Sequence, residues 1–196
     1  MNLAVTLYAN LLRIALGFAA FYHLFKRNYK PLTSSACAFG LTYLPAVFER
    51  MFSYHLDSVG NILYFTIIIM TIYLGNSLKF YDRFAWWDYL IHFLSGCLFV
   101  SVGIALANRM ANLNQFPILF FSFTLSITLH VIWEVLEYIT DCLFHSDNQR
   151  WQKVNPTHNH QPESAIQPAG LVDTMNDTLI CILGTTIACI IWWFVL

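Results

Sequence analysis

Six long apolar stretches dominate this chain, and each is about as long as a helix that crosses a bilayer. A spanning helix needs about 20 mostly apolar residues, because every backbone amide must be hydrogen-bonded within the segment. The stretches are Leu3–Phe25, Thr33–Phe52, Val59–Phe80, Asp88–Asn108, Phe116–Phe144 and Val172–Val195. The sequence therefore predicts an all-α fold, a polytopic membrane bundle of about six transmembrane helices.

The composition also indicates a lipid environment. Hydrophobic residues make up 58% of the 196 residues and charged residues 11%, whereas about 25% of a soluble domain is charged. Ten Lys and Arg against eleven Asp and Glu leave no broad basic surface for nucleic acid. The five cysteines contain no Cys-x-x-Cys pair, so neither structural disulfides nor a zinc knuckle has support. The lipid bilayer is the predicted partner, and nucleic acid is excluded.

The connections predict one membrane domain over residues 1–196, with a single long loop at 145–171. Short cytoplasmic loops carry an excess of Lys and Arg. Basic residues gather after the first, third and fifth stretches, at Lys26, Arg27, Lys30, Lys79, Arg83, Arg150 and Lys153. We therefore predict that residues 145–171 are cytoplasmic and that both termini lie on the other side. If Leu3–Phe25, which carries Arg13, does not span, only the amino terminus changes side.

Ionisable residues within the stretches gather at the predicted cytoplasmic end. A charge at the centre of a spanning helix costs roughly 2.5–3.5 kcal/mol on insertion scales, so each one is a functional candidate. Helical spacing of three or four places them on three one-sided stripes. The stripes are Asp88 and His92; His130, Glu134, Glu137 and Asp141; and Asp173 and Asp177. At about 1.5 Å per residue, Asp88, Asp141 and Asp173 lie at the interface, with the others deeper.

Carboxylates packed this closely cannot all stay charged without compensation. Either protons are shared among them or a divalent cation neutralises them. Carboxylate oxygens with an imidazole suit Zn, Mn or Fe. The predicted metal ligands are Asp88, His92, Glu137, Asp173 and Asp177. Glu134 and Glu137 are the predicted catalytic residues, as ligand or general base, and we interpret His130 as a hydrogen-bonded core histidine.

The spacing leaves three interpretations of the cluster open. The fifth stretch reads His-x-x-x-Glu-x-x-Glu, unlike the Glu-x-x-His of di-iron bundles. A metal site, a proton-sharing network and structural hydrogen bonding between helices all remain compatible with it. Outside the cluster, Glu49 is expected to pair with Arg50 or Arg13, and His158 and His160 of the long loop are expected to be solvated. Close helix approach is predicted at Gly96, Gly103 and Gly184.

Several segments resemble a known family. The segments are LGNSLKFYDRFAWWDYLIHFLSG (Leu74–Gly96), WEVLE (Trp133–Glu137), DTMNDTLICILG (Asp173–Gly184) and LPAVFER (Leu44–Arg50). They resemble the YjdF-like family of bacterial inner-membrane proteins over nearly the whole chain, and the last three stretches are loosely similar to VanZ-like membrane proteins. The resemblance implies a multi-pass protein of the bacterial inner (cytoplasmic) membrane, but it supplies no reaction. It marks as the family's polar positions Asp88, His92, Glu134, Glu137, Asp173 and Asp177.

Three functions are compatible with these patterns. The first is a metal-dependent enzyme that acts on a lipid-like substrate at the cytoplasmic face. The second is a proton-coupled transporter, although polarity at one end of the bundle favours a site over a pathway across it. The third is a structural or assembly role, in which the polar residues fix helix packing.

Overall fold

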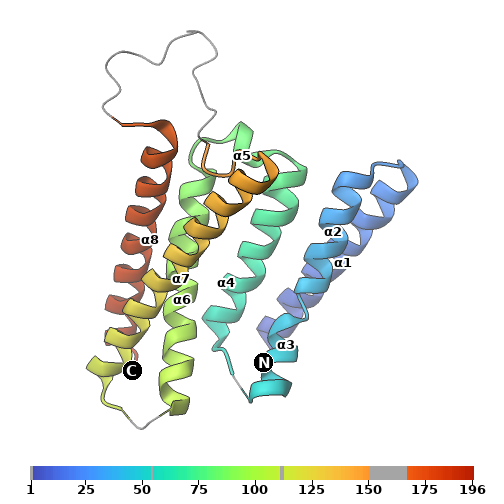
Figure 1. Ribbon diagram of the computed structural model, residues 1–196. Coiled ribbons are helices and arrows are strands. Elements are labelled where there is room, and N and C mark those ends of the chain that lie inside the picture. Colours follow the sequence, from blue (N-terminus) through green and yellow to red (C-terminus); the bar gives the residue numbers. More distant parts are fainter. Residues whose placement is uncertain (1, 54, 111–112, 151–166) are drawn as a thin grey trace.

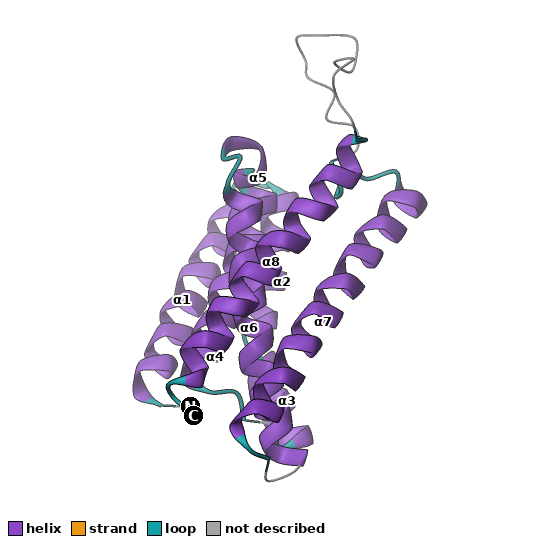
Figure 2. Cartoon of the chain, turned by 90° about the vertical axis from the view of Figure 1, so that its left-hand side faces the viewer, coloured by secondary structure: helices purple, strands orange, loops and turns teal. Residues whose placement is uncertain are grey.

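The computed structural model describes residues 2–53, 55–110, 113–150 and 167–196 (Figure 1). Throughout this described part the regular structure is helical, which confirms the predicted fold class (Figure 2). The elements are α1 (Leu3–Phe25), α2 (Tyr29–Leu41), α3 (Leu44–Phe52), α4 (Ser58–Ile68), the π-helix η1 (Ile69–Ser77), α5 (Phe80–Arg83), α6 (Trp87–Met110), α7 (Gln115–Phe144) and α8 (Ala169–Trp193).

Five helices are long and apolar enough to cross a membrane. They are α1, the continuous α4–η1 segment Ser58–Ser77, α6, α7 and α8. The remaining predicted stretch, Thr33–Phe52, is divided into α2 and α3 by turn residues Thr42 and Tyr43. Pro45, in the first turn of α3, has no N–H to donate to the carbonyl of Leu41, which explains the break. Because α2 and α3 follow one another down the bundle, the prediction of about six passes fits the fold (Figure 1).

The connections are sorted between the two ends of the bundle. Both termini lie at one end, together with the α3–α4 connection (Figure 1). At the opposite end are α5, the turn between α1 and α2, and residues 145–150, which follow α7. The loops after the first, third and fifth passes therefore share one end, as the basic-residue pattern predicts.

Small residues let α6 approach α7 and α8 closely. A Cβ at Gly96 or Gly184 would collide with the backbone of the facing helix, and one at Gly103 would collide with Ser122 of α7. Val100 and Ala188 belong to the buried apolar cluster next to these contacts. The predicted role of these glycines is confirmed, and the tight packing fixes the three helices that carry the polar stripes.

Arg13 of α1 binds the break between α2 and α3. Its Nε donates to Thr42 Oγ1 at 3.0 Å and its Nη2 to the Thr42 carbonyl at 2.8 Å. Its guanidinium also lies 4.1 Å from the centroid of the Tyr43 ring. The helix break leaves the Thr42 carbonyl available to Arg13, which could not be predicted from the length of the apolar stretch.

The predicted pairing of Glu49 with Arg50 or Arg13 is wrong, because Glu49 Oε1 lies 3.1 Å from His55 Nδ1.

Candidate functional site

His92 lies at the centre of a cluster that joins α6 and α8. Asp88 is one turn before it on the same face of α6, with Oδ1 3.6 Å from His92 Nε2. From α8, Asp177 Oδ2 lies 3.7 Å from the same nitrogen. All three residues are buried, and one ligand atom from each lies within 4.8 Å of the others. We call Asp88, His92 and Asp177 the outer group.

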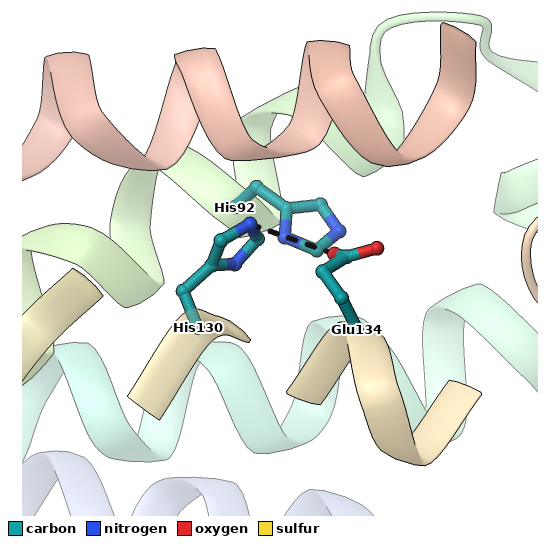
Figure 3. A group of neighbouring side chains, drawn as sticks. All are labelled: His92, His130 and Glu134. Carbon is teal, nitrogen blue, oxygen red and sulfur yellow. Dashed lines mark ion pairs between the residues drawn. The ribbon is translucent and has the colours of Figure 1, made fainter. Parts of the chain in front are cut away.

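A second group adds α7 to the first. His130 and Glu134 lie one turn apart, with His130 Nε2 3.5 Å from Glu134 Oε1, and both face His92 of α6 (Figure 3). The His92 and His130 rings meet edge to face, with centroids 5.3 Å apart. One ligand atom each from His92, His130 and Glu134 also falls within 4.8 Å of the others. We call these three residues the inner group, which shares His92 with the outer group.

His130 is hydrogen-bonded to Thr178 of α8. The Thr178 hydroxyl donates to the Thr174 carbonyl at 2.7 Å. This bond uses the only hydrogen of the Thr178 hydroxyl. His130 Nε2 lies 3.1 Å from Thr178 Oγ1 and is therefore the donor in the contact between the two side chains. The interpretation of His130 as a hydrogen-bonded histidine fits this contact, but the spacing argument missed that it also faces His92 and Glu134.

Four buried atoms in the two groups lack hydrogen-bond partners among the described residues. They are His92 Nδ1, Asp177 Oδ1 and both carboxylate oxygens of Glu134. The Thr174 side chain lies near Glu134, but outside hydrogen-bond geometry. Leaving a buried polar atom unpaired costs roughly 1–3 kcal/mol. The cluster is therefore well placed to accept a group that supplies positive charge.

Arg150 supplies part of that charge, and the sequence analysis missed it as a member of the site. Its Nη2 lies 2.7 Å from Asp88 Oδ2, and its Nη1 lies 3.9 Å from Asp173 Oδ1. Within the described residues, no Lys or Arg forms such a pair with Asp177 or Glu134. From the sequence, Arg150 was predicted only to be a basic residue of the cytoplasmic loop. Its position shortly after the acidic stripe, at the same end of the bundle, was a signal that it could contact the acidic residues.

Asp141 holds the loop that carries Arg150. Its carboxylate accepts hydrogen bonds from Ser146 Oγ at 2.7 Å and from the backbone N–H groups of Asn148 at 2.8 Å and Gln149 at 3.0 Å. Asp141 therefore stabilises the chain just after α7. Although it belongs to the predicted stripe, it is absent from both groups of ligand atoms.

Glu137 lies at the edge of the cluster. Its Oε1 accepts a hydrogen bond of 2.7 Å from Trp133 Nε1 on the same helix, and it belongs to neither group. Tyr81 belongs to α5, and its ring packs on Gly75 of η1. Burial, followed by the nearby Asp88 and Glu137 carboxylates, raises the pKa of the Tyr81 phenol, so it stays protonated at neutral pH.

The fold thus brings part of the predicted ligand set together. Asp88, His92 and Asp177 converge directly, and Asp173 joins them through Arg150. Glu134 lies in the inner group, while Glu137 lies outside both. The loop histidines His158 and His160 lie outside the described residues.

Comparison with known proteins places the chain in a family. It is 23% identical over 144 residues to an uncharacterised protein of Thermotoga maritima, an alignment that covers 72% of this chain and 66% of the relative. The match thus spans slightly less than two thirds of that protein. No solved structure matches the chain. The profile of a family of predicted membrane proteins, DUF2238, matches residues 6–196. This is the YjdF-like family that the sequence resembles, and the chain belongs to it.

Proposed function

We propose that this integral membrane protein binds a divalent metal at the outer group and acts as a metal-dependent enzyme on a lipid-like substrate at the cytoplasmic face of a bacterial inner membrane. The observation that carries the proposal is the convergence of Asp88, His92 and Asp177 within 4.8 Å from two helices. Two carboxylates and one imidazole are a donor set that suits Zn, Mn or Fe. The orientation follows from the basic residues at that end of the bundle.

The unpaired atoms of the cluster support a cation more strongly than they support structural hydrogen bonding. Asp177 is 2% exposed, and its Oδ1 has no hydrogen-bond partner among the described residues. A buried carboxylate held for structural reasons is expected to be paired or fully hydrogen-bonded. Asp173 and Glu137, at the edge of the site, add negative potential and are the remaining predicted ligands.

Glu134 is suited to act as a general base. A divalent cation bound to the outer group supplies Lewis acidity that makes water a stronger nucleophile. Glu134 is buried next to His92, and neither of its oxygens is hydrogen-bonded within the described chain. Its carboxylate is therefore free to take a proton from a water molecule between the helices. Glu137 is the second predicted base, with one oxygen held by Trp133.

A lipid-like substrate fits the surroundings of the cluster. The faces of α7 and α8 near these residues expose large apolar side chains, including Val131, Val135, Met175 and Leu179. In a bilayer these faces contact acyl chains, so a lipid brings its polar end to the carboxylates while its tail stays in hydrocarbon.

Elemental analysis of protein purified without chelator tests the proposal. We expect about one metal ion per chain after loading with Zn or Mn, and none in His92→Ala. His23→Ala is the matched control, because His23 is also buried but contacts Tyr73 at 3.2 Å, away from the cluster, so it should keep the metal. A metal-free wild type whose melting temperature does not change with Zn or Mn would overturn the proposal.

The catalytic part of the proposal has its own test. In vesicles of bacterial polar lipids, wild-type protein with Mn should produce hydrolysed lipid that mass spectrometry detects. Glu134→Gln should still bind metal through the outer group but form no product. Metal-loaded wild type that converts none of these lipids would contradict the lipid-like substrate, and full activity in Glu134→Gln would contradict the role of Glu134 as base.

A further inference from the structure

We infer that the cation has a second, deeper position in the inner group, between His92, His130 and Glu134, and that a single ion occupies either this position or the outer one. The inference rests on the proposed metal site and adds a second location to it. Both groups have ligand atoms within 4.8 Å of one another, and both include His92.

Glu134 is the main evidence for the deeper position. It is 6% exposed, and neither of its oxygens has a hydrogen-bond partner among the described residues. Figure 3 shows its carboxylate directed towards the two imidazoles rather than away from the helices. A carboxylate buried at this depth without a donor is costly unless a cation or a proton compensates it.

The imidazoles can serve this position at little cost. His92 Nδ1 has no hydrogen-bond partner among the described residues, so its lone pair is available in the appropriate tautomer. If His130 gives up its contact with Thr178, the Thr178 hydroxyl still donates to the Thr174 carbonyl at 2.7 Å. Metal binding to His130 therefore leaves no hydroxyl hydrogen unpaired.

Sharing His92 makes the two positions alternatives. A neutral imidazole has one lone pair for a metal, and two divalent ions this close in a bilayer would repel each other strongly. The donor sets also differ. The outer position offers one nitrogen and two carboxylates, which suit Mn, whereas the inner position offers two nitrogens and one carboxylate, a set found in catalytic zinc sites. Zinc is therefore expected to prefer the inner position.

X-ray absorption spectroscopy at the zinc edge distinguishes the positions by counting imidazole ligands. We expect wild-type protein to bind one Zn with two imidazoles. Asp177→Asn, which weakens only the outer group, should keep one Zn with two imidazoles. Glu134→Gln, which weakens only the inner group, should keep one Zn with a single imidazole. His130→Ala should behave like Glu134→Gln, and Asp88→Asn provides a second variant of the outer group.

The outcomes separate this inference from the proposed function. Loss of Zn in Asp177→Asn and Asp88→Asn, with monodisperse and helical protein, would overturn the deeper position and leave the outer site standing. Two Zn ions in the wild type would overturn the alternation. A single imidazole in both wild type and Glu134→Gln would also overturn the inference. Wild-type protein that binds neither Zn nor Mn would overturn the proposed function as well.

Discussion

Arg13 of α1 and the acidic residues of the carboxy-terminal helices α6–α8 are all ionisable groups within apolar segments, but they differ in their hydrogen bonding. In the first region, Arg13 donates to the carbonyl and hydroxyl of Thr42 and, through Nη1, to Asn10 Oδ1 at 3.1 Å. In the second region, Asp177 and Glu134 keep buried oxygens without a hydrogen-bond partner in the described chain. A polar group that is fully bonded stabilises the fold, whereas a buried carboxylate left unpaired needs an explanation, which the proposed cation supplies.

The first region shows how a break in an apolar helical stretch is stabilised. Pro45 leaves the Leu41 carbonyl without its helical donor, and Tyr64 of α4 donates its hydroxyl to that carbonyl at 3.0 Å. Arg13 satisfies the next carbonyl, that of Thr42, at 2.8 Å. Non-helical backbone at membrane depth is stable where neighbouring helices satisfy it in this way.

Removal of Arg13 should give the largest effect on stability. Arg13→Ala leaves the Thr42 carbonyl unpaired and removes the stacking on Tyr43, so we expect a loss of about 3 kcal/mol. Denaturation in mixed micelles measures this loss. Arg109→Ala, at the exposed end of α6, should change stability by less than about 0.5 kcal/mol. Equal effects of the two substitutions would mean that Arg13 does not support the helix break.

Glycine substitutions should have opposite signs in the two regions. Gly184→Ala would push its new Cβ into the backbone of Phe93 and separate α8 from α6, at a cost of roughly 1–3 kcal/mol. Gly17→Ala in α1 meets nothing within 4 Å, so it should gain about 0.5–1 kcal/mol from helix propensity. Thermal unfolding of the two variants in the same detergent provides the measurement. A stable Gly184→Ala protein would show that close contact of α6 and α8 is unnecessary.

Much of the fold was predictable from the sequence, because the length of an apolar run determines where a helix can span. The predicted runs match the helices to within a few residues except at Thr33–Phe52, where hydropathy does not register the break at Thr42 and Tyr43. Pro45 was the available signal. Loop charges also predicted correctly which connections share an end.

The candidate site was only partly predictable. Helical spacing and topology were enough to predict that Asp88, His92 and Asp177 meet, because these residues lie on rigid helices. The contact of Arg150 with Asp88 depends on a loop shaped by hydrogen bonds to Asp141, which no spacing rule provides. The spacing of three or four residues that defines the stripes also does not predict local partners. Trp133, for example, donates a hydrogen bond to one oxygen of Glu137.

Two aspartates near the same end of the bundle offer a final test, because one is hydrogen-bonded and the other is not. Asn keeps the size of Asp but replaces one acceptor oxygen with a donor. Asp141→Asn should lose about 1–2 kcal/mol, since the new amide cannot accept from the Gln149 N–H that bonds Oδ2 at 3.0 Å. In metal-free protein, Asp177→Asn should instead gain about 1 kcal/mol, because it removes a buried carboxyl group that no Lys or Arg of the described chain pairs.

Unfolding of both variants after chelator treatment distinguishes a ligand site from interhelical packing. If the carboxylates were structural, Asp177→Asn would be the more damaging change, since Asp177 is 2% exposed and lies between α6 and α8. The proposed site requires the reverse order without metal, together with loss of the stabilisation that Mn gives the wild type. A ligand at 100 times its dissociation constant stabilises by about 2.7 kcal/mol, which is larger than the gain of about 1 kcal/mol expected for metal-free Asp177→Asn. The same pair of variants therefore reports both on what holds the helices together and on what the carboxylates bind.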